Sequence, residues 1–530
     1  MKELIQALIN QGIITAIDIQ RMTTLELLLT IVERVNELHG LTKEGLVAVQ
    51  RLLDKGVQEE VVAKLDEWLQ DGTMDTLINQ TALKTVNDRI DDVVEKINNE
   101  PVFKNGVLEL PNDFPKLPFS VYKYNNNYSS SISPYTAFDW SDATQIYISN
   151  RTGSGDGLTP SSAISIGRFD YNLKNGVYGD KKKFIVNILN NVLVDKNTLT
   201  IDSQGVDILF RSLAPNGFSW CGRFLRPNTN GECETTWVLS DGVYKITQSK
   251  TYNITDVINL KDLDDAKMPK AYRRVPSLSE CKTIMGSYYQ GESSNVIYCN
   301  PHLNHHIKDV ILLVPTTWLH LNPSTPNTFV FENIGFPSES FRVKPTDLNC
   351  QLYFFGCKFY RNPNDAISFN GAYHTYLFNC LASHGTKDGF NYHTTNTESL
   401  AVEVNCHSFN NGVLKLDNGN QTTHSNNGST AHDGMNVLRV GCTYWNCEGP
   451  IVADVDGCYS INIGCKATDI ADTSTGFKAS FYFSNPRKSY VIECEGGGKN
   501  VEYGVIGDSN TVVNGFKGNK NYNGNIQIID

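Results

Sequence analysis

A short phrase that recurs through the second half of the chain limits the possible folds more than any other feature of the sequence. Each copy joins a few strand-forming or polar residues to a turn residue, usually Gly or Asn, and in most copies to a cysteine. The copies begin at Phe331, Phe354, Leu377, Glu403, Arg439, Asn462 and Val491, which lie 23, 23, 26, 36, 23 and 29 residues apart. A strand that ends at the same position in each period is typical of a β-helix. We therefore predict a mainly β chain that forms a right-handed parallel β-helix.

Six cysteines end successive copies of the phrase and should stack as one column inside the β-helix. They are Cys357, Cys380, Cys406, Cys442, Cys465 and Cys494. A free cysteine behaves as a small buried hydrophobe, so inward stacking explains these residues without disulfides. A redox or zinc cluster is the alternative, although the chain has no CxxC pair of the kind that zinc ribbons use.

The first hundred residues differ in character from the rest. They hold 10 Lys and Arg against 18 Asp and Glu, and so carry −8 of the total formal charge of −11. A capping box at residues 23–26 and apolar residues at helical spacing indicate helices, with further helices expected at 42–54 and 57–70. We predict a helical attachment domain over residues 1–80.

A heptad pattern follows over residues 81–100. Its core positions are Leu83, Val86, Ile90, Val93 and Ile97, spaced by 3, 4, 3 and 4 residues. β-Branched Val at the second core position disfavours a two-stranded coiled coil, so this segment is predicted to be a short trimeric stalk. An amphipathic helix packed within its own domain is the alternative.

Prolines and runs of Asn and Ser mark residues 101–145 as a linker or an extended strap. Strand-forming residues begin at Ile146, and we assign residues 146–530 to the β-helix. At roughly 25 residues per coil, this length gives about a dozen coils.

The net charge and the hydropathy of the chain argue against binding to nucleic acid and against insertion into a membrane. A net charge of −11 opposes binding to nucleic acid, because phosphate recognition requires clustered Lys and Arg. The first twenty residues lack the basic cluster of a signal peptide, and no stretch of 18 uncharged apolar residues occurs. We therefore expect neither a membrane span nor export by a cleaved leader.

A second strand should follow each copy of the phrase, and the alternation of strand side chains separates its two faces. The apolar positions taken as inward are Ile367, Phe369, Phe390, Tyr392, Leu414, Leu416, Ala453, Val455, Phe477 and Ala479. One outward column is then Ser368, Asn391, Lys415, Asp454 and Lys478, and the other is Asn370, His393, Asp417, Asp456 and Ser480. These columns would bring charged groups from distant parts of the sequence to one face.

The coil with the spacing of 36 is longer than its neighbours, and we place the extra residues in a polar loop from Asn418 to Asp433 beside this face. The candidate catalytic residues are Asp388, His393, Asp417, His432, Asp433, Asp454 and Asp456. The candidate polymer-binding residues are Asn391, Lys415, Tyr444, Trp445 and Lys478. Solvated surface charges and packing aromatics are the alternatives for each.

Paired carboxylates suit polysaccharide cleavage, in which one acid protonates the leaving oxygen while its partner activates water or attacks. Asp454 and Asp456 lie two residues apart on a predicted strand, a separation of about 7 Å that suits inversion better than retention. No cofactor is predicted. Calcium binding by the same two carboxylates is the alternative, although their spacing matches no standard calcium loop.

Two regions resemble one family. Residues 21–28 (RMTTLELL) and 68–73 (WLQDGT) are similar to the amino-terminal part of tail-spike and neck-appendage proteins of short-tailed phages that infect Gram-positive, staphylococcal-type bacteria. Residues 156–160 (DGLTP), 388–393 (DGFNYH), 429–434 (STAHDG) and 449–455 (GPIVADV) resemble pectin-lyase-like phage domains. Residues 161–330 carry no such likeness.

The resemblance implies a homotrimer in the phage virion that contacts neck, collar or tail proteins through residues 1–100. It also implies a β-helix that binds, and often cleaves, a host polymer such as wall teichoic acid or another surface polysaccharide. The protein would be made in the host cytoplasm, and lysis of the host cell would release the assembled particle. This would explain an extracellular role without a leader.

Three functions therefore remain open. The chain could be a depolymerase of the glycosidase or phosphodiesterase type, or a non-enzymatic adhesin that uses the same groove. A secreted bacterial pectate lyase would require a signal peptide and a basic, calcium-linked uronate site, and the sequence shows neither.

Overall fold

The structure is a computed structural model of the 530-residue chain. It describes residues 100–149, 155–190, 192–193, 199–201, 205–222, 224–225, 237–247, 254, 256–263, 268–291, 294–307, 310–313, 319–338, 341–412, 426–472 and 476–529. The predicted helical domain (1–80) and the predicted stalk with Leu83, Val86, Ile90, Val93 and Ile97 lie outside the described residues.

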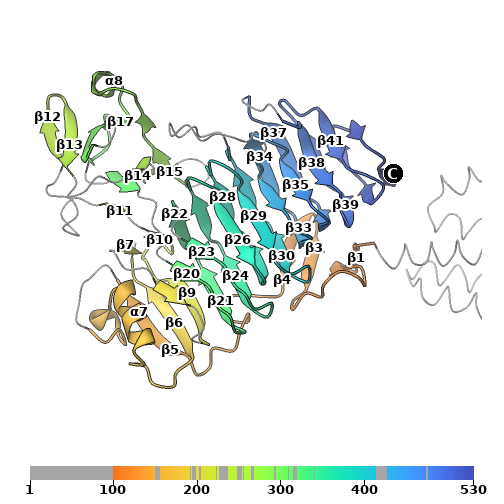
Figure 1. The fold of residues 1–530 in the computed structure, drawn as a ribbon, viewed down its shortest axis with the longest axis horizontal. Coiled ribbons are helices and arrows are strands. Elements are labelled where there is room, and N and C mark those ends of the chain that lie inside the picture. The colour runs from red at the N-terminus through yellow and green to blue at the C-terminus, as the bar shows by residue number, and fades with distance from the viewer. Residues whose placement is uncertain are drawn as a thin grey trace, which may run out of the picture. The chain divides into compact units, whose positions relative to one another are not determined.

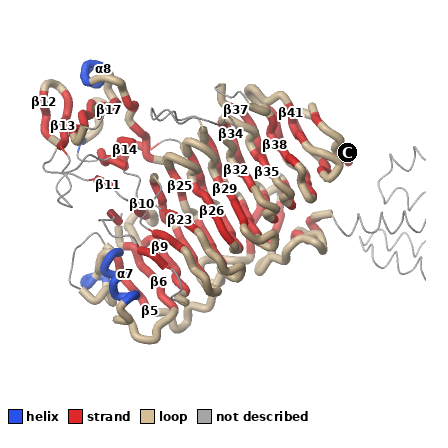
Figure 2. The backbone as a smooth tube through the Cα atoms, in the orientation of Figure 1, coloured by secondary structure: helices blue, strands red, loops and turns tan. Residues whose placement is uncertain are grey.

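Three long parallel sheets wind around one core, and this confirms the predicted parallel β-helix (Figures 1 and 2). Within a complete coil the chain passes from sheet 1 to sheet 2 to sheet 3 and then returns to sheet 1 one level further along. A continuous buried cluster fills the interior from Ile146 to Phe516.

Sheet 1 contains β5 (Thr144–Ile148), β6 (Lys183–Ile188), β9 (Asp207–Ser212), β21 (Thr328–Glu332), β24 (Gln351–Phe355), β27 (His374–Phe378), β30 (Leu400–Val404), β33 (Asn436–Val440), β36 (Tyr459–Ile463), β39 (Lys488–Ile492), β42 (Thr511–Asn514) and β45 (Gln527–Ile529). Sheet 2 contains β7 (Val192–Leu193), β10 (Ser219–Gly222), β22 (Ile334–Pro337), β25 (Lys358–Tyr360), β28 (Leu381–Ser383), β31 (His407–Phe409), β34 (Thr443–Cys447), β37 (Lys466–Ile470), β40 (Glu495–Gly497) and β43 (Lys517–Gly518). Sheet 3 contains β8 (Leu199–Ile201), β20 (Leu319–Leu321), β23 (Phe341–Val343), β26 (Ile367–Gly371), β29 (Phe390–Thr394), β32 (Ser429–Ala431), β35 (Val452–Val455), β38 (Ala479–Ser484), β41 (Tyr503–Ile506) and β44 (Tyr522–Asn523).

The repeated phrase marks the bend between sheets 1 and 2. Its turn residue has φ between +51° and +63° in eight successive coils, from β21 to β42. These residues are Asn333, Gly356, Asn379, Asn405, Gly441, Gly464, Glu493 and Gly515. Gly and Asn tolerate this left-handed conformation better than other residues, which explains why they dominate the position.

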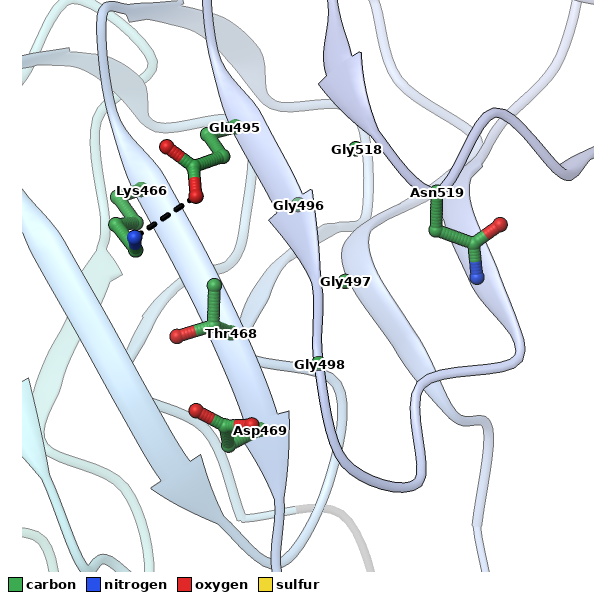
Figure 3. Close-up of a pocket in the computed structure, with 9 residues that line it drawn as sticks. All are labelled: Lys466, Thr468, Asp469, Glu495, Gly496, Gly497, Gly498, Gly518 and Asn519. Carbon is green, nitrogen blue, oxygen red and sulfur yellow. Dashed lines mark ion pairs between the residues drawn. The ribbon is translucent and has the colours of Figure 1, made fainter.

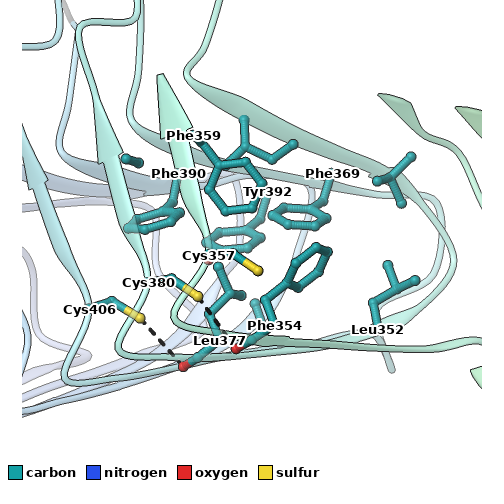
Figure 4. Close-up of a cluster of buried hydrophobic side chains, with 14 of the residues drawn as sticks. Leu352, Phe354, Cys357, Phe359, Phe369, Leu377, Cys380, Phe390, Tyr392 and Cys406 are labelled. Atoms are coloured by element: carbon teal, nitrogen blue, oxygen red, sulfur yellow. Dashed lines mark hydrogen bonds between the residues drawn. The ribbon is translucent and has the colours of Figure 1, made fainter. Parts of the chain in front are cut away.

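The cysteine of each phrase follows the bend and points into the core, as predicted. The six thiols are at most 1% exposed and stack from coil to coil (Figure 4). Each sulfur lies 3.3–3.5 Å from a backbone carbonyl oxygen of the preceding coil. Every cysteine among the described residues is free and buried. The column is therefore explained by packing and weak S–H···O contacts.

The assignment of all residues from 146 to 530 to the β-helix is wrong between β10 and β20. An insertion there forms two mainly antiparallel sheets, seen in yellow-green at the upper left of Figure 1. One sheet contains β11 (Phe224–Leu225), β19 (Val310–Leu313), β14 (Asp256–Leu263) and β15 (Pro269–Ala271). The other contains β12 (Val238–Ser240), β13 (Val243–Thr247), β18 (Val296–Asn300), β17 (Ser287–Gln290) and β16 (Arg273–Arg274), beside helix α8 (Leu278–Thr283). These strands lack the repeated phrase, because they pair as hairpins rather than coils.

Helices are few among the described residues. A 3-10 turn, η2 (Pro160–Ser162), precedes α7 (Ile166–Lys174), whose first turn is capped by the Ser165 hydroxyl. Phe169 of α7 packs edge-on against Phe184 of β6 and so covers the first coils. No helix in the described ranges combines the length and the hydropathy that a membrane span requires.

Residues 103–109 and 114–145 form a strap that packs along sheet 1. The strap contains β1 (Val102–Lys104), β2 (Val107–Glu109), β3 (Val121–Tyr124) and β4 (Asn127–Ser130), which pair in one small sheet (Figure 1). The Asn405 amide donates to the backbone oxygen of Tyr128 at 2.7 Å, and Phe119 packs edge-on against Tyr376. The proline-rich segment is therefore bound to the β-helix over several coils.

Alanine at Gly464 should release the strap. A Cβ added at Gly464 would lie 1.9 Å from the Tyr128 hydroxyl, and φ there is +59°. Gly515 is the matched control, because its φ is +61° but an added Cβ meets no atom closer than 3.7 Å. Both changes should cost about 1 kcal/mol of backbone strain, and Gly464→Ala should in addition expose residues 121–130 to limited proteolysis. Equal protease resistance in the two variants would contradict this account.

Candidate functional site

Four of the predicted catalytic residues come together at the carboxyl ends of the strands of sheet 3. Phe390 of β29 pairs with Ser429 of β32, and this register places His393 beside His432. Their imidazole rings are stacked in parallel, with centroids 4.3 Å apart and an interplanar angle of 4°. Asp433 and Asp456 follow the ends of β32 and β35. We call His393, His432, Asp433 and Asp456 the His–Asp cluster.

Repeated Asp-Gly turns position the two carboxylates. Asp433 and Asp456 both have φ of +60°, and each is followed by a glycine with positive φ. Asp residues adopt this conformation more readily than most, so the strands end here and the side chains project from the turns.

Each imidazole has its own carboxylate. Asp433 Oδ2 lies 3.0 Å from His393 Nδ1, and Asp456 Oδ2 lies 3.9 Å from His432 Nδ1. The His432 side chain is 24% exposed and that of His393 is 37% exposed, so both rings remain accessible to a ligand. The Asp433 carboxylate holds one ring nitrogen of His393 and leaves the other to exchange a proton, whereas Nε2 of His432 also lies 3.4 Å from the Thr430 hydroxyl.

His432 is the better candidate for a base. Burial, together with the nearby His393, lowers the pKa of His432 below its ordinary value of 6.5, although the surrounding aspartates oppose this change. Its imidazole is therefore neutral at pH 7 and can accept a proton.

Asp388 belongs to a separate carboxylate pair at the opposite ends of the same strands. Asp365 lies beside it on the preceding coil, because Ile367 pairs with Phe390. Burial and the adjacent Asp365 raise the pKa of Asp388 well above its ordinary range. Five residues of extended chain, about 16 Å, separate Asp388 from His393, so Asp388 does not join the His–Asp cluster. The spacing of 23 residues between Asp365 and Asp388 was a signal that the sequence analysis missed.

Asn391 lies on the outward column of sheet 3 between these two groups, as predicted. It pairs with Ser368 on one side and Thr430 on the other. The residue is only 5% exposed, and its Oδ1 atom has no hydrogen-bond partner. A buried carbonyl oxygen without a donor is costly, so this atom is a candidate contact for a ligand.

Asp454 was predicted to lie on the outward face, and this position is wrong, because the residue is completely buried. Ala431 pairs with Asp454, so Val452 and Asp454 point into the core while Ala453 and Val455 point outward. The Arg439 guanidinium donates to both carboxylate oxygens of Asp454, at 2.7 and 2.8 Å. The prediction that Ala453 and Val455 face the core is wrong. The buried guanidinium of Arg439 neutralises the Asp454 carboxylate, and Asp454 can therefore face the core instead.

Glu403 extends this buried network. Its carboxylate accepts hydrogen bonds from the hydroxyls of Tyr392 (3.0 Å), Ser429 (2.6 Å) and Tyr444 (2.8 Å). Burial raises the pKa of Glu403 from its ordinary value of 4.5 to about 7. Tyr444, predicted to bind polymer, is fully buried and holds Glu403 instead.

Glu403→Gln should remove a pH dependence of stability. Between about pH 4.5 and pH 7 the folded protein keeps a proton on Glu403 that the unfolded chain has released. Wild-type stability should therefore fall as pH rises through this window, by up to about 3 kcal/mol. Denaturant unfolding at pH 4.5 and pH 8 should show this loss in wild type but not in the glutamine variant. A constant difference between the two proteins would overturn the assignment.

Glu403, Cys406 and Cys442 have ligand atoms within 4.8 Å of one another. The glutamate oxygens are already occupied by three hydroxyls. Burial raises the pKa of the Cys442 thiol to about 12, whereas metals bind the thiolate. The chemistry of this group therefore suits core packing.

The other predicted site residues differ in where the structure places them. Trp445 is partly exposed on the outward face of sheet 2, and Lys478 forms an ion pair with Glu502 at 3.3 Å. Phe477, expected inward, is 57% exposed. Lys415 and Asp417 lie outside the described residues, and the strand that pairs with β29 on this side is β32. The predicted loop over 418–433 is therefore wrong at its end, because Ser429–Ala431 is a strand.

Comparison with known proteins supports the fold. No protein-family model and no curated protein matches the sequence. A solved structure described as a glycoside hydrolase matches with a TM-score of 0.50 at 10% identity, covering 73% of this chain and 95% of its own. Pectate lyase Pel9A matches at 10% identity with a TM-score of 0.30, covering 70% of this chain and 78% of its own. The tailspike protein gp49 from Pseudomonas phage LKA1 matches at 10% identity with a TM-score of 0.17, covering 68% and 71%. The first match indicates a shared fold, and the other two are too distant to add to it.

Proposed function

We propose that this chain is a phage tail-spike protein whose β-helix binds and cleaves a bacterial surface glycopolymer, such as wall teichoic acid or capsule. The His–Asp cluster is the observation that carries the proposal, because it places two imidazoles and two carboxylates on one accessible edge of a β-helix. The phage assignment, the homotrimer and attachment through residues 1–100 rest on the sequence resemblance.

A phosphodiester is the linkage that this cluster suits best. His432 would take a proton from water, whose oxygen attacks phosphorus, while the bond from phosphorus to the leaving oxygen breaks. His393, oriented by Asp433, would give a proton to that oxygen, so the products are a phosphomonoester and an alcohol. The two neighbouring imidazoles thus supply both the base and the acid of this reaction.

Glycosidic cleavage is the second candidate, and the carboxylate pair favours it. The raised pKa of Asp388 is a property of general acids in glycosidases, and Asp365 is the adjacent carboxylate. A non-enzymatic adhesin would use the same outward face, with Asn391 as a contact.

The test is to incubate the purified protein with Gram-positive cell walls and with poly(glycerol phosphate), and to assay phosphomonoester and reducing ends. Release of phosphomonoester would support the His–Asp cluster, and release of reducing ends would favour Asp365 and Asp388. Tight wall binding without release would identify an adhesin. Neither binding nor release would overturn the proposal.

A further inference from the structure

The outward face of sheet 2 carries a column of side chains in which two adjacent aromatic residues are followed by threonine and then glycine. Strand pairing places in one column Tyr360, Ser383, Phe409, Trp445, Thr468 and Gly497. The first part of this column is covered by the insertion, where Phe409 and Tyr360 pack with Ile258 and Met268. Trp445 lies at the border of that covered region.

One face of the Trp445 indole is occupied and the other is not packed by a large neighbour. Phe409 stacks against it, with centroids 4.4 Å apart and an angle of 13°. The next residue on the opposite side is Thr468, and after it comes Gly497, which has no side chain. The side chains on this side of the indole are therefore much smaller than the indole, and they leave space above the backbone of the sheet.

Thr468, the register neighbour of Trp445, lines a pocket of about 510 Å³ that Trp445 itself does not line (Figure 3). Its floor is the bare backbone of Gly496, Gly497 and Gly498, between Lys466 and Glu495 on one side and Asn519 on the other. The glycine loop is held in place, because the Asp469 carboxylate accepts from the Lys499 amide at 2.8 Å. A Cβ at Gly498 would lie 2.3 Å from that carboxylate, so the loop requires glycine.

The lining indicates the class of ligand. Lys466 and Glu495 form an ion pair at 2.8 Å, and Asp469 adds negative charge, so an anionic group such as phosphate is disfavoured. Lys466, Thr468 and Asn519 supply donors, Asp469 and Glu495 supply acceptors, and the Trp445 indole lies one strand away beside Thr468. A sugar ring has matching properties, because its C–H face packs on aromatics while its hydroxyls both donate and accept.

We propose that Trp445 and this pocket form a binding subsite for a neutral pyranose ring of a glycan. The subsite lies on sheet 2, whereas the His–Asp cluster lies on sheet 3, so it adds a second contact for a glycosylated polymer. It concerns binding alone and does not depend on cleavage.

The test is calorimetric titration of the full chain with cellohexaose, chitohexaose and, as a polymer without sugar rings, poly(glycerol phosphate). At least one hexasaccharide should bind, and Trp445→Ala should weaken it about tenfold or more. Thr468→Trp should also weaken it about tenfold or more, because it fills the pocket while continuing the aromatic stack. Ser509→Trp, on an exposed turn, controls for an added indole and should change nothing.

Three results would overturn the subsite. They are no binding of either hexasaccharide at about 10 mM, unchanged affinity in Thr468→Trp, and equal binding of poly(glycerol phosphate). Because the titration needs no cleavage, such a failure would leave the release assay and the proposed function unaffected.

Discussion

Arg439→Met should destabilise the β-helix by about 3–5 kcal/mol, the usual effect of breaking a buried ion pair. Arg439, Asp454 and Glu403 are all completely buried. Removing the guanidinium leaves the Asp454 carboxylate in the core without its cation, and water cannot replace the lost hydrogen bonds. Urea unfolding followed by circular dichroism would measure the change.

Two controls separate charge compensation from packing. Arg342→Met, at an exposed position on β23, should change stability by less than about 0.5 kcal/mol. Combining Arg439→Met with Asp454→Leu below pH 7 should recover much of the loss, because the unpaired carboxylate is gone and Glu403, which keeps its proton there, retains its three hydroxyl partners. A single Arg439 variant as stable as wild type would refute the compensating role.

His432→Gln should lower the rate of polymer cleavage by a factor of about 10² to 10⁴, the usual contribution of a general base. Glutamine keeps a similar size and polarity, so the fold and polymer binding should survive. Because the pKa of His432 lies below 6.5, the acid-side decline of wild-type kcat/KM should begin only when the pH drops below that value. Release assays across pH would show this decline and its absence in the residual activity of the variant.

His374→Gln is the matched control. His374 is a partly buried histidine on β27 of sheet 1, and burial lowers its pKa as well. Its replacement should leave the rate and the pH profile unchanged. If His432→Gln cleaves polymer at the wild-type rate, the His–Asp cluster is not the catalytic site.

Asp454 and Asp456 illustrate how a predicted pair separated. Both were expected on one outward face, but one lies in the core and the other is 66% exposed beside His432. The first position of the repeated phrase could have revealed this, because it holds Phe354 and Leu377 in two coils and then Glu403 and Arg439. Opposite charges at successive inward positions indicate a buried ionic network.

The turn residues and cysteines were predictable for a simple reason. A β-helix repeats one local geometry, so the left-handed bend selects Gly or Asn and the inward site selects a small apolar residue in every coil. The insertion between β10 and β20 could not be found this way, because hairpins carry no coil-to-coil repeat.

Spacing along a repeating chain was enough to predict the coil period, the cysteine column and the grouping of His393, His432 and Asp433. The folded chain was needed to establish which residue of β35 faces inward, since a partner 15 residues away, Arg439, makes a buried Asp454 favourable. It also decided that Asp388 belongs with Asp365 and that Tyr444 points inward while Trp445 points out. Which residues of a strand face the core depends on its register with the neighbouring strand. For β35 that neighbour is β32, and the pairing of the two strands is established only in the folded chain.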